Sequence, residues 1–497
     1  MMWAGKLWGI GVAVAGIMFC ADPAIAKYQQ VYLIQNSGWM EPFYSDPEAK
    51  FRPLVRALIQ ASRLDDQEIV VAAFNQAGSV PGQPSPKVVY QGEGKATEVS
   101  SAIETIVLPR RPNGIFADTD FEGALNACFK DLLRQKSGLI WMVTNNKNDP
   151  HNSPDVISHT REFYRLLREH PGILRVIAYP IEMPARGRYF REGGLMIYGI
   201  AYGQTGNQAL QRILAGEPMR KLFNDPPARL KPLGEESVRF EPKTVLTPGV
   251  EAKVQRGTLV IRGIGAEKGS KVVIKGRLHN DFFPQEIKSG RLSLHWQDFH
   301  GGLQAHELQN EISPSEVRDL RTGGVIENVR VGLAIPPIPS VWSADSLLRD
   351  GYEVKGVLRI SLEDQQLALS PKFLDKMEHV FGLGQLPEIF RPDQAVTASN
   401  TLVPVRIIVG FPVWPLALAV TAAVLLLGGG VTTAILAGRE RRYKLSVDGN
   451  DVTVSVKPFR KKPVLTTNGR QVAELKGALF GKPGVKRTDE SSRIEFL

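Results

Sequence analysis

The chain has 497 residues, a formal net charge of +10 and 43% apolar residues, a composition typical of globular proteins with sizeable cores. Its two cysteines are Cys20 and Cys128, and Cys20 lies in an N-terminal segment that has the features of a secretory signal. The composition therefore excludes an internal disulfide in the mature chain.

Residues 1–26 predict a signal peptide. Lys6 supplies the positive charge, Leu7–Cys20 the apolar core, and Ala24–Ala26 a small-x-small cleavage site. An uncleaved anchor helix is the alternative that the same pattern allows. Because an exported chain with neither a disulfide nor an Asn-x-Ser/Thr glycosylation acceptor is typical of bacteria, we expect a bacterial envelope protein.

Residues 27–216 predict an α/β domain. Val31–Met40 begins with four apolar residues and ends in a polar turn, which is typical of a buried parallel strand that runs into a loop. Further strands are expected at Glu68–Phe74, Lys87–Tyr90, Gly138–Thr144, Leu174–Ile181 and Leu195–Tyr202. Helical spacing between them, as in Pro47–Arg63, predicts a doubly wound parallel sheet.

Three polar loops are expected at one edge of this sheet. Two of them follow strands, at Gln35–Met40 and Thr144–Asn146, and the third, Asp118–Asp120, precedes a helix. Ligands of open α/β sheets bind at the carboxyl ends of the strands, so we expect these loops to converge there. The expected partner-binding face consists of Gln35, Asn36, Ser37, Gly38, Trp39, Thr119 and Asn145.

These loops resemble those of von Willebrand factor A-type domains over about residues 27–216. The family's first loop reads Asp-x-Ser-x-Ser; here Ser37 and Met40 fit, while Gln35 replaces the Asp and Trp39 the second Ser. The loop around Thr119 is similar to the family's Thr loop. The resemblance implies a doubly wound fold with a degenerate metal-ion-dependent adhesion site.

The resemblance also implies where a cation would sit. Hard divalent cations prefer several oxygen ligands with net negative charge, and neither Gln35 nor Asn145 supplies that charge. No cofactor is therefore expected, and a weakly held divalent cation is the alternative. The candidate ligands at this site are Ser37, Thr119, Asp118 and Asp149. A separate candidate site for zinc or manganese lies at a helix start, where Asp149, Asp155 and His159 cluster.

No nucleophile, zinc or phosphate-loop motif appears in the sequence, so an enzyme is not expected. Two alternatives remain open from the residues: an exported metal-dependent enzyme that uses Asp149 and His159, and a cation-dependent adhesin.

The remainder of the chain predicts five further parts. Residues 217–237 are proline-rich and predict a linker, and residues 238–370 predict an antiparallel, immunoglobulin-like β-sandwich. Residues 371–412 predict a juxtamembrane linker that includes a short helix at Pro371–Leu383. Residues 413–437 lack charge over a length that, as a helix, reaches roughly 37 Å, enough to cross about 30 Å of hydrocarbon.

Basic residues follow the apolar segment directly, which predicts that the C-terminus is cytoplasmic and the N-terminal domains are periplasmic, with the chain crossing the bacterial inner membrane once. Residues 438–497 predict a small basic β-rich domain with hairpin turns at Asp448–Asn450 and Asn468-Gly469. Its basic residues predict binding to anionic lipid or to a cytoplasmic protein, not to nucleic acid: Arg439, Arg441, Arg442, Lys444, Arg460, Lys461 and Lys462. We expect a membrane-anchored scaffold or assembly factor that binds a periplasmic protein partner.

Overall fold

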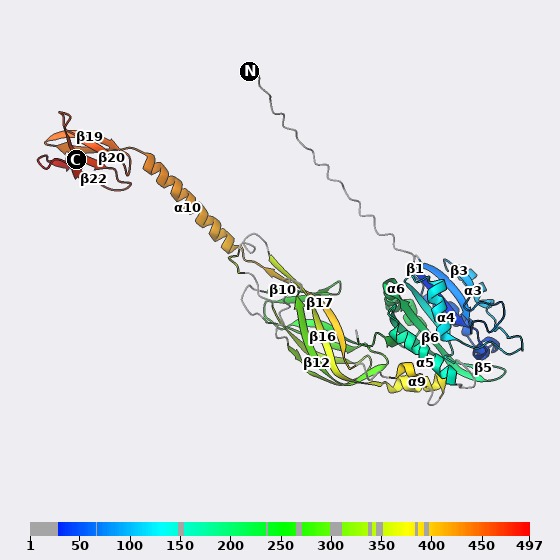
Figure 1. The fold of residues 1–497 in the computed structure, drawn as a ribbon. Helices are drawn as coiled ribbons and strands as arrows, with labels where there is room; N and C mark the ends of the chain where they lie inside the picture. The colour runs from blue at the N-terminus through cyan, green and yellow to red at the C-terminus, as the bar shows by residue number, and fades with distance from the viewer. Residues whose placement is uncertain are drawn as a thin grey trace, which may run out of the picture. The chain divides into compact units, whose positions relative to one another are not determined.

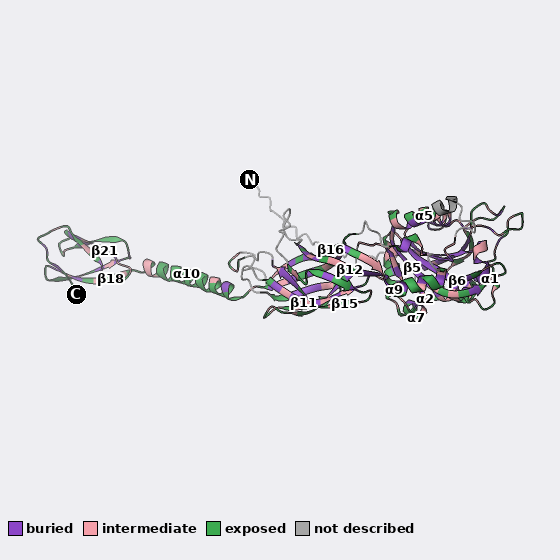
Figure 2. Ribbon diagram, turned by 90° about the horizontal axis from the view of Figure 1, so that it is seen from below, coloured by how far each residue is buried: buried purple, intermediate pink, exposed green. Residues whose placement is uncertain are grey.

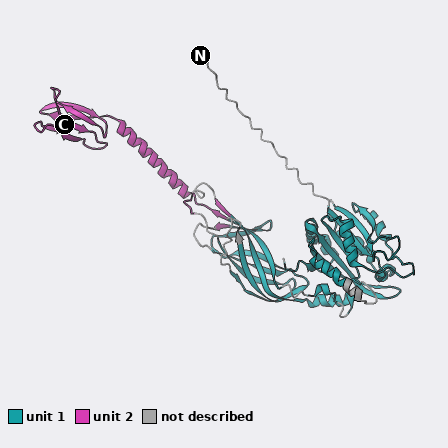
Figure 3. Cartoon of the chain, viewed as in Figure 1, with its two compact units in different colours: residues 1–261, 269–336, 354–407 teal, residues 262–268, 337–353, 408–497 magenta. Residues whose placement is uncertain are grey.

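The computed structural model describes residues 28–65, 67–147, 154–234, 237–264, 271–298, 311–335, 340–343, 351–382, 386–391 and 397–497. The predicted signal peptide at 1–26 lies outside the described residues. The chain forms two compact units, one of residues 1–261, 269–336 and 354–407 and the other of residues 262–268, 337–353 and 408–497 (Figure 3).

The N-terminal part of the first unit is built on a seven-stranded sheet with the order β3-β2-β1-β4-β6-β5-β7 (Figure 1). The strands are β1 (Tyr28–Gln35), β2 (Gln67–Phe74), β3 (Lys87–Gly92), β4 (Gly138–Thr144), β5 (Ile173–Arg186), β6 (Arg191–Tyr202) and β7 (Ala228–Lys231). β1 lies between β2 and β4 and runs parallel to both.

Helices cover both faces of this sheet. They are α1 (Glu41–Ser45), α2 (Phe51–Ala61), α3 (Ala96–Glu104), α4 (Phe121–Ala127), α5 (Pro154–Glu169), α6 (Gly203–Ala215) and α7 (Glu217–Leu222), with a short 3-10 turn at Gly38–Met40 and a π-helical turn at Cys128–Leu132. Successive side chains of β1 alternate between the faces: Val31 and Leu33 join one core cluster, Tyr32 and Ile34 the other. Because β1 is apolar on both sides, it occupies a central position.

The sheet is mixed, which corrects the expected parallel sheet. β6 runs antiparallel to both β4 and β5. The two expected strands at Leu174–Ile181 and Leu195–Tyr202 are the inner halves of one long hairpin, closed by a turn in which the Gly187 N–H donates to the Phe190 carbonyl at 2.9 Å. A hairpin forces antiparallel pairing, because its strands are joined without a crossover.

The predicted linker at 217–237 contains ordered elements instead. It begins with α7, and β7 follows as an edge strand that pairs antiparallel with β5. Ala228 and Leu230 of β7 are buried. The prolines of this segment lie outside β7, so they do not interrupt its pairing.

The predicted linker at 371–412 is also largely structured. It contains α9 (Pro371–Phe381), a 3-10 turn (Glu388–Phe390) and β17 (Ser399–Gly410). Phe373, Met377 and Val380 recur at helical spacing on α9 and are at most 2% exposed. Phe373 and Met377 belong to the same core cluster as β1, so this late segment completes the N-terminal core.

Two β-sheets follow the N-terminal part. The orders are β14-β12-β16-β17-β10-β9 and β13-β15-β11-β8. Their strands are β8 (Val238–Val245), β9 (Glu251–Gln255), β10 (Thr258–Ile264), β11 (Lys271–Asn280), β12 (Gln285–Asp298), β13 (Glu311–Ser313), β14 (Glu316–Leu320), β15 (Val325–Ala334), β16 (Gly351–Leu369) and β17. Burial alternates along β11, so one side of its sheet faces a core (Figure 2).

The second unit contains α10 (Trp414–Gly438), which is long and apolar enough to cross a membrane by length and composition. Most of its side chains are exposed, as Figure 2 shows. After α10 come β18 (Arg441–Val447), β19 (Asn450–Val456), β20 (Lys461–Leu465), β21 (Gln471–Lys476), β22 (Gly484–Arg487) and β23 (Ile494–Phe496), which form two three-stranded sheets. These sheets share a small core that includes Leu445, Val464 and Leu475.

Candidate functional site

Three loops converge at the carboxyl end of β1, around the side chain of Gln35. The Gln35 amide nitrogen donates to the Ser37 hydroxyl at 2.7 Å and to the Thr119 hydroxyl at 2.8 Å. Its amide oxygen accepts from the Thr144 hydroxyl at 2.5 Å and from the Asn145 N–H at 3.2 Å. Thr119 also donates to Ser37 at 2.6 Å, which closes the network.

The orientation of the Gln35 amide follows from its neighbours. The backbone N–H of Asn145 can only donate, so the atom of Gln35 that faces it is the oxygen. The amide nitrogen must then face the two hydroxyls. The Gln35 amide nitrogen therefore lies against the Ser37 and Thr119 oxygens, and the network satisfies its buried polar groups internally.

The structure revises the expected partner-binding face. Gln35, Ser37 and Asn145 are fully buried, and Asn36 and Thr119 are 8% and 7% exposed. Asn36 joins loops, donating to the Val107 carbonyl at 3.0 Å and accepting from Asn75. Among the seven expected residues, Gly38 and Trp39 alone are half-buried, so the others support the surface from below.

The nearby acidic groups are already engaged. Glu41 accepts from the Ser45 hydroxyl and from the Arg188 N–H. Asp118 forms an ion pair with Arg111, and Asp120 caps α4 by accepting from the Gly123 N–H at 2.8 Å. None of these carboxylates hydrogen-bonds to the Gln35 network in the part of the chain that the structure describes.

The other metal candidates fall where the structure gives no side-chain positions. Asp149 lies outside the described residues, as do the side chains of Asp155 and His159. Among the described residues, no group of three or more His, Cys, Asp or Glu side chains has the spacing to hold a metal ion.

A second polar layer lies above the network and includes a buried carboxylate. Asn145 donates to the Trp39 carbonyl at 2.8 Å and to Glu192 at 3.4 Å, and the Lys147 ammonium lies 2.9 Å from the same Glu192 oxygen. Burial raises the pKa of Glu192, opposed in part by Lys147 and by the Asn145 hydrogen bond. This layer fixes Trp39, whose ring contacts Phe190 edge-on at 5.3 Å.

An apolar groove opens beside Trp39. It has a volume of about 400 Å³ and is lined by residues of the first loop, the segment before Thr119 and the β5–β6 turn: Gly38, Trp39, Arg110, Gly114, Ile115, Phe116, Ala117, Asp118, Tyr189 and Phe190. Ile115 and Tyr189 are each 61% exposed. Phe116 and Tyr189 contact edge-on at 6.4 Å across the groove.

Arginines flank the aromatic rings of the groove. The Arg110 guanidinium lies 3.9 Å from the centre of the Phe116 ring, and that of Arg188 lies 5.6 Å from the centre of the Tyr189 ring. Gly38 permits the close approach of the first loop to this wall, because a Cβ at Gly38 would lie 2.7 Å from the Cβ of Phe116.

Sequence reasoning missed most of the groove residues. Tyr189, Phe190 and Glu192 belong to the β5–β6 hairpin, whose outer half was not predicted to be a strand. The signal that could have found it is Gly187 flanked by arginines and followed by two adjacent aromatics, since a glycine between β-type segments marks a turn.

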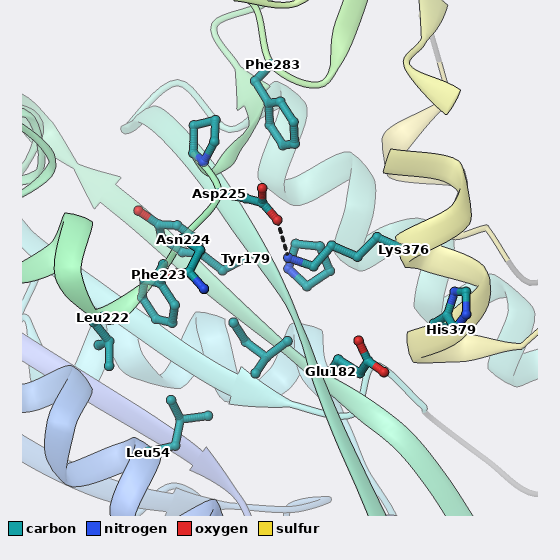
Figure 4. A pocket seen from close by; sticks show the side chains of 13 residues that line it. Leu54, Tyr179, Glu182, Leu222, Phe223, Asn224, Asp225, Phe283, Lys376 and His379 are labelled. Carbon is teal, nitrogen blue, oxygen red and sulfur yellow. Dashed lines mark hydrogen bonds and ion pairs between the residues drawn. The ribbon is translucent and has the colours of Figure 1, made fainter. Parts of the chain in front are cut away.

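A second cavity, of about 460 Å³, lies between β5, the segment after α7, and α9 (Figure 4). Its most polar feature is Asp225, which forms ion pairs with Lys372 at 2.8 Å and Lys376 at 2.9 Å. Hydrogen bonds from Lys372 and Lys376 lower the pKa of Asp225. These ion pairs help to hold α9 in place, and two lysines against one aspartate leave the cluster with a net charge of +1.

The predicted basic residues after α10 lie at the surface. Arg439, Arg442, Lys444, Arg460, Lys461 and Lys462 are exposed and Arg441 is half-buried. Lys461 lies 3.5 Å from Glu474, a surface ion pair of small energetic weight.

No family model matches the chain, and no curated protein matches it. Among solved structures, the chain is similar to the ASH / PapD-like domain of human CEP192 (PapD-like domain 7), with 11% sequence identity and a TM-score of 0.16, over 33% of this chain and 85% of that chain. A likeness at this level supports no inference about fold or function.

Proposed function

We propose that the chain is a membrane-anchored scaffold or assembly factor of the bacterial envelope, and that its N-terminal domain binds a protein partner in the apolar groove beside Trp39. The observation that carries this proposal is the exposure of Ile115 and Tyr189, each 61%, at a groove of about 400 Å³. Contiguous exposed aromatic surface on a folded domain is typical of interaction sites.

The buried network beneath the groove supports a binding role over a metal-dependent one. Gln35 donates both amide hydrogens to Ser37 and Thr119, so the hydroxyls are occupied without a cation. The N-terminal domain is then an A-type-like domain with a degenerate metal site. Its network fixes the loops that carry Trp39 and Phe116, and the surface above them makes the contact.

The rest of the architecture fits an anchored protein. α10 serves as the single membrane span, with the N-terminal domains in the periplasm and residues 438–497 in the cytoplasm, as the basic residues after Gly438 favour. The β-sheets between β8 and β17 act as an immunoglobulin-like spacer between the groove and the membrane.

Site-specific photocrosslinking tests this function. A photoreactive amino acid is placed at Ile115 or Tyr189 in the full chain in native membranes, and at Leu246, which is 46% exposed on a distant surface, as the matched control. Both groove positions should crosslink to the same protein, and Leu246 should not. The crosslink at Ile115 should fall at least about tenfold in the Tyr189→Ser variant, because loss of a central aromatic contact costs 1.4 kcal/mol or more, about tenfold in affinity. Equal crosslinking at all three positions contradicts the proposal.

A further inference from the structure

The small β-domain after α10 has a defined end that faces back toward the helix. Only Arg439 and Glu440 separate the last residue of α10, Gly438, from the first residue of β18, Arg441. Gly438 and Arg441 are three residue steps apart, which span at most about 11 Å, so the start of β18 is tethered close to the end of α10. The proposal below therefore depends on α10 crossing the membrane, as proposed above.

Strand register shows which loops share that end. Arg441 pairs with Val456, so the loop after β19 begins beside the start of β18. Lys461 pairs with Lys476, and Lys476 pairs with Gly484, which brings the start of β20 and the loop between β21 and β22 to the same end. The loops 457–460 and 477–483 are therefore the helix-proximal loops of the domain.

Backbone contacts tie these two loops together. The Phe459 N–H donates to the Gly477 carbonyl at 2.8 Å, and the Gly477 N–H donates to the Arg460 carbonyl at 2.9 Å. A Cβ at Gly477 would lie 2.3 Å from the Lys457 carbonyl oxygen, so only glycine permits this approach. The two loops are therefore held together by backbone contacts and form one continuous surface.

That surface carries two exposed aromatic rings. Phe459 is 64% exposed and Phe480 is 69% exposed. Phe459 also has a φ of 61°, in the left-handed region that bulky side chains rarely adopt. Holding a phenylalanine in a strained conformation that directs it outward serves no packing purpose, and such strain is characteristic of functional positions.

The charge around the rings is positive. Lys457, Arg460, Lys461, Lys476 and Lys482 are exposed in or beside these loops, next to Arg439 and Arg442. Electrostatic attraction at physiological salt is screened over about 8 Å, so it acts on basic groups that the short connection to α10 holds near the bilayer surface. Aromatic rings flanked by basic residues match the interface of an anionic bilayer, in which rings lie at the headgroup level and cations pair with lipid phosphates.

We propose that Phe459 and Phe480, with the surrounding basic residues, form a second membrane contact that holds the C-terminal domain flat against the anionic leaflet into which α10 runs. The occupant is the lipid surface itself. The two-residue connection holds these loops near the bilayer surface, and the aromatic and basic side chains then bring them into contact with it.

Lipid-borne quenching of a site-specific fluorophore tests the proposal on the full chain reconstituted in bilayers. The label is placed on Ala478→Cys, in the helix-proximal loop, or on Asn468→Cys, in the opposite turn, in a Cys20→Ala background. Cys128 is fully buried, so the chain without an added cysteine should take up no label. In phosphatidylglycerol bilayers with a headgroup-level quencher, the label at 478 should be quenched at least twofold more than the label at 468.

The matched variants separate contact from folding. The double variant Phe459→Gly, Phe480→Ser should reduce quenching at 478 to the level at 468. Because Phe459→Gly removes backbone strain, the melting temperature of the double variant should not fall. Leu465→Ser, an exposed apolar residue at the opposite end, is the control and should change nothing. Neutral phosphatidylcholine bilayers should abolish the difference between the two labels.

Each contrary result has a defined meaning. The membrane contact is wrong if the labels at 478 and 468 are quenched equally. It is also wrong if the quenching at 478 does not change when the two phenylalanines are replaced or when the anionic lipid is exchanged for neutral lipid. A protein would then be the occupant of the surface. A label at Gly429→Cys in α10 checks the premise independently. If that label escapes a quencher at the bilayer centre, both the anchor and the membrane contact are wrong; if it is quenched while 478 is not, only the membrane contact is wrong.

Discussion

The amide nitrogen of Gln35 lies 2.8 Å from the hydroxyl oxygen of Thr119, although the two residues are 84 positions apart. This contact joins the end of β1 to the loop before α4 and leaves the Thr119 oxygen occupied. It helps to hold three strand-end loops together. The amide acts as a neutral bridge, donating on one side and accepting on the other.

Removing this amide should destabilise the N-terminal domain. Gln35→Met keeps the length of the side chain but leaves the Ser37, Thr119 and Thr144 hydroxyls without their amide partner in a buried site. Because an unsatisfied buried polar group costs about 1–3 kcal/mol, we expect a loss of roughly 2–4 kcal/mol in unfolding free energy, measured by chemical denaturation. Gln83→Met, in an exposed turn, is the control and should change stability by less than about 0.5 kcal/mol. Equal effects of both substitutions would contradict the bridging role.

Gln35→Asp should convert the site into one that responds to metal. The shorter carboxylate vacates the position of the amide nitrogen and supplies a charged oxygen beside the Ser37 and Thr119 hydroxyls, a ligand set that suits a hard cation. We expect millimolar Mg²⁺ or Mn²⁺ to raise the melting temperature of this variant, and a chelator to reverse the rise. The wild-type melting temperature should respond to neither. A wild-type chain that a chelator destabilises would show that the site holds a cation after all.

Sequence reasoning predicted where the loops of this network meet, but not that its polar side chains are buried. The convergence of the loops after β1 and β4 followed from apolar strands that end in polar turns, because parallel strands share an edge. Whether Gln35 would face solvent or close the site depends on side-chain packing, which periodicity does not encode. The sequence therefore indicated the correct position for the loops and assigned too much exposure to Gln35, Ser37 and Asn145.

The late segment around α9 was harder to predict, for a different reason. Phe373 and Met377 have helical spacing, but their partners lie on strands some two hundred positions earlier in the chain. Local pattern identifies an amphipathic helix without naming the surface that it covers. Its position just before the apolar segment favoured a juxtamembrane linker with a short helix at Pro371–Leu383, and tertiary packing made that helix part of a core instead.

Phe373 should therefore matter more than its neighbour on the same helix. Phe373 is 1% exposed and Leu374 is 37% exposed. Phe373→Ala should lower the unfolding free energy by about 3–5 kcal/mol, as truncation of a buried phenylalanine typically does. Leu374→Ala should cost less than about 1 kcal/mol, and the comparison by denaturant titration controls for helix propensity. Equal costs would mean that α9 does not complete the N-terminal core in solution.

Glu192 should make the stability of the domain depend on pH. Burial raises its pKa above the ordinary value of 4.5, so the folded state holds the proton more tightly than the unfolded state. The resulting stabilisation is present below pH 4.5 and is lost as the pH rises through the raised pKa. Glu192→Gln stays neutral, so its melting temperature should gain on that of the wild type as the pH rises from 4.5 to neutrality. Melting curves that stay parallel over this range would contradict the raised pKa.

The direction of α10 can be tested with reporter fusions, because its flanks differ in charge. Val413 and Trp414 precede or begin the helix, whereas Arg439, Arg441 and Arg442 follow it, and basic flanks stay on the cytoplasmic side. An enzyme that is active only outside the cytoplasm should work when fused after Pro412 and fail when fused after Lys444. A cytoplasmic reporter should give the opposite pattern, which guards against a fusion that is inactive because it is degraded. Replacing Arg439, Arg441 and Arg442 with Asn should weaken this asymmetry without changing the helix itself. Extracytoplasmic activity at both junctions would exclude a single span, and activity at Lys444 alone would reverse its orientation.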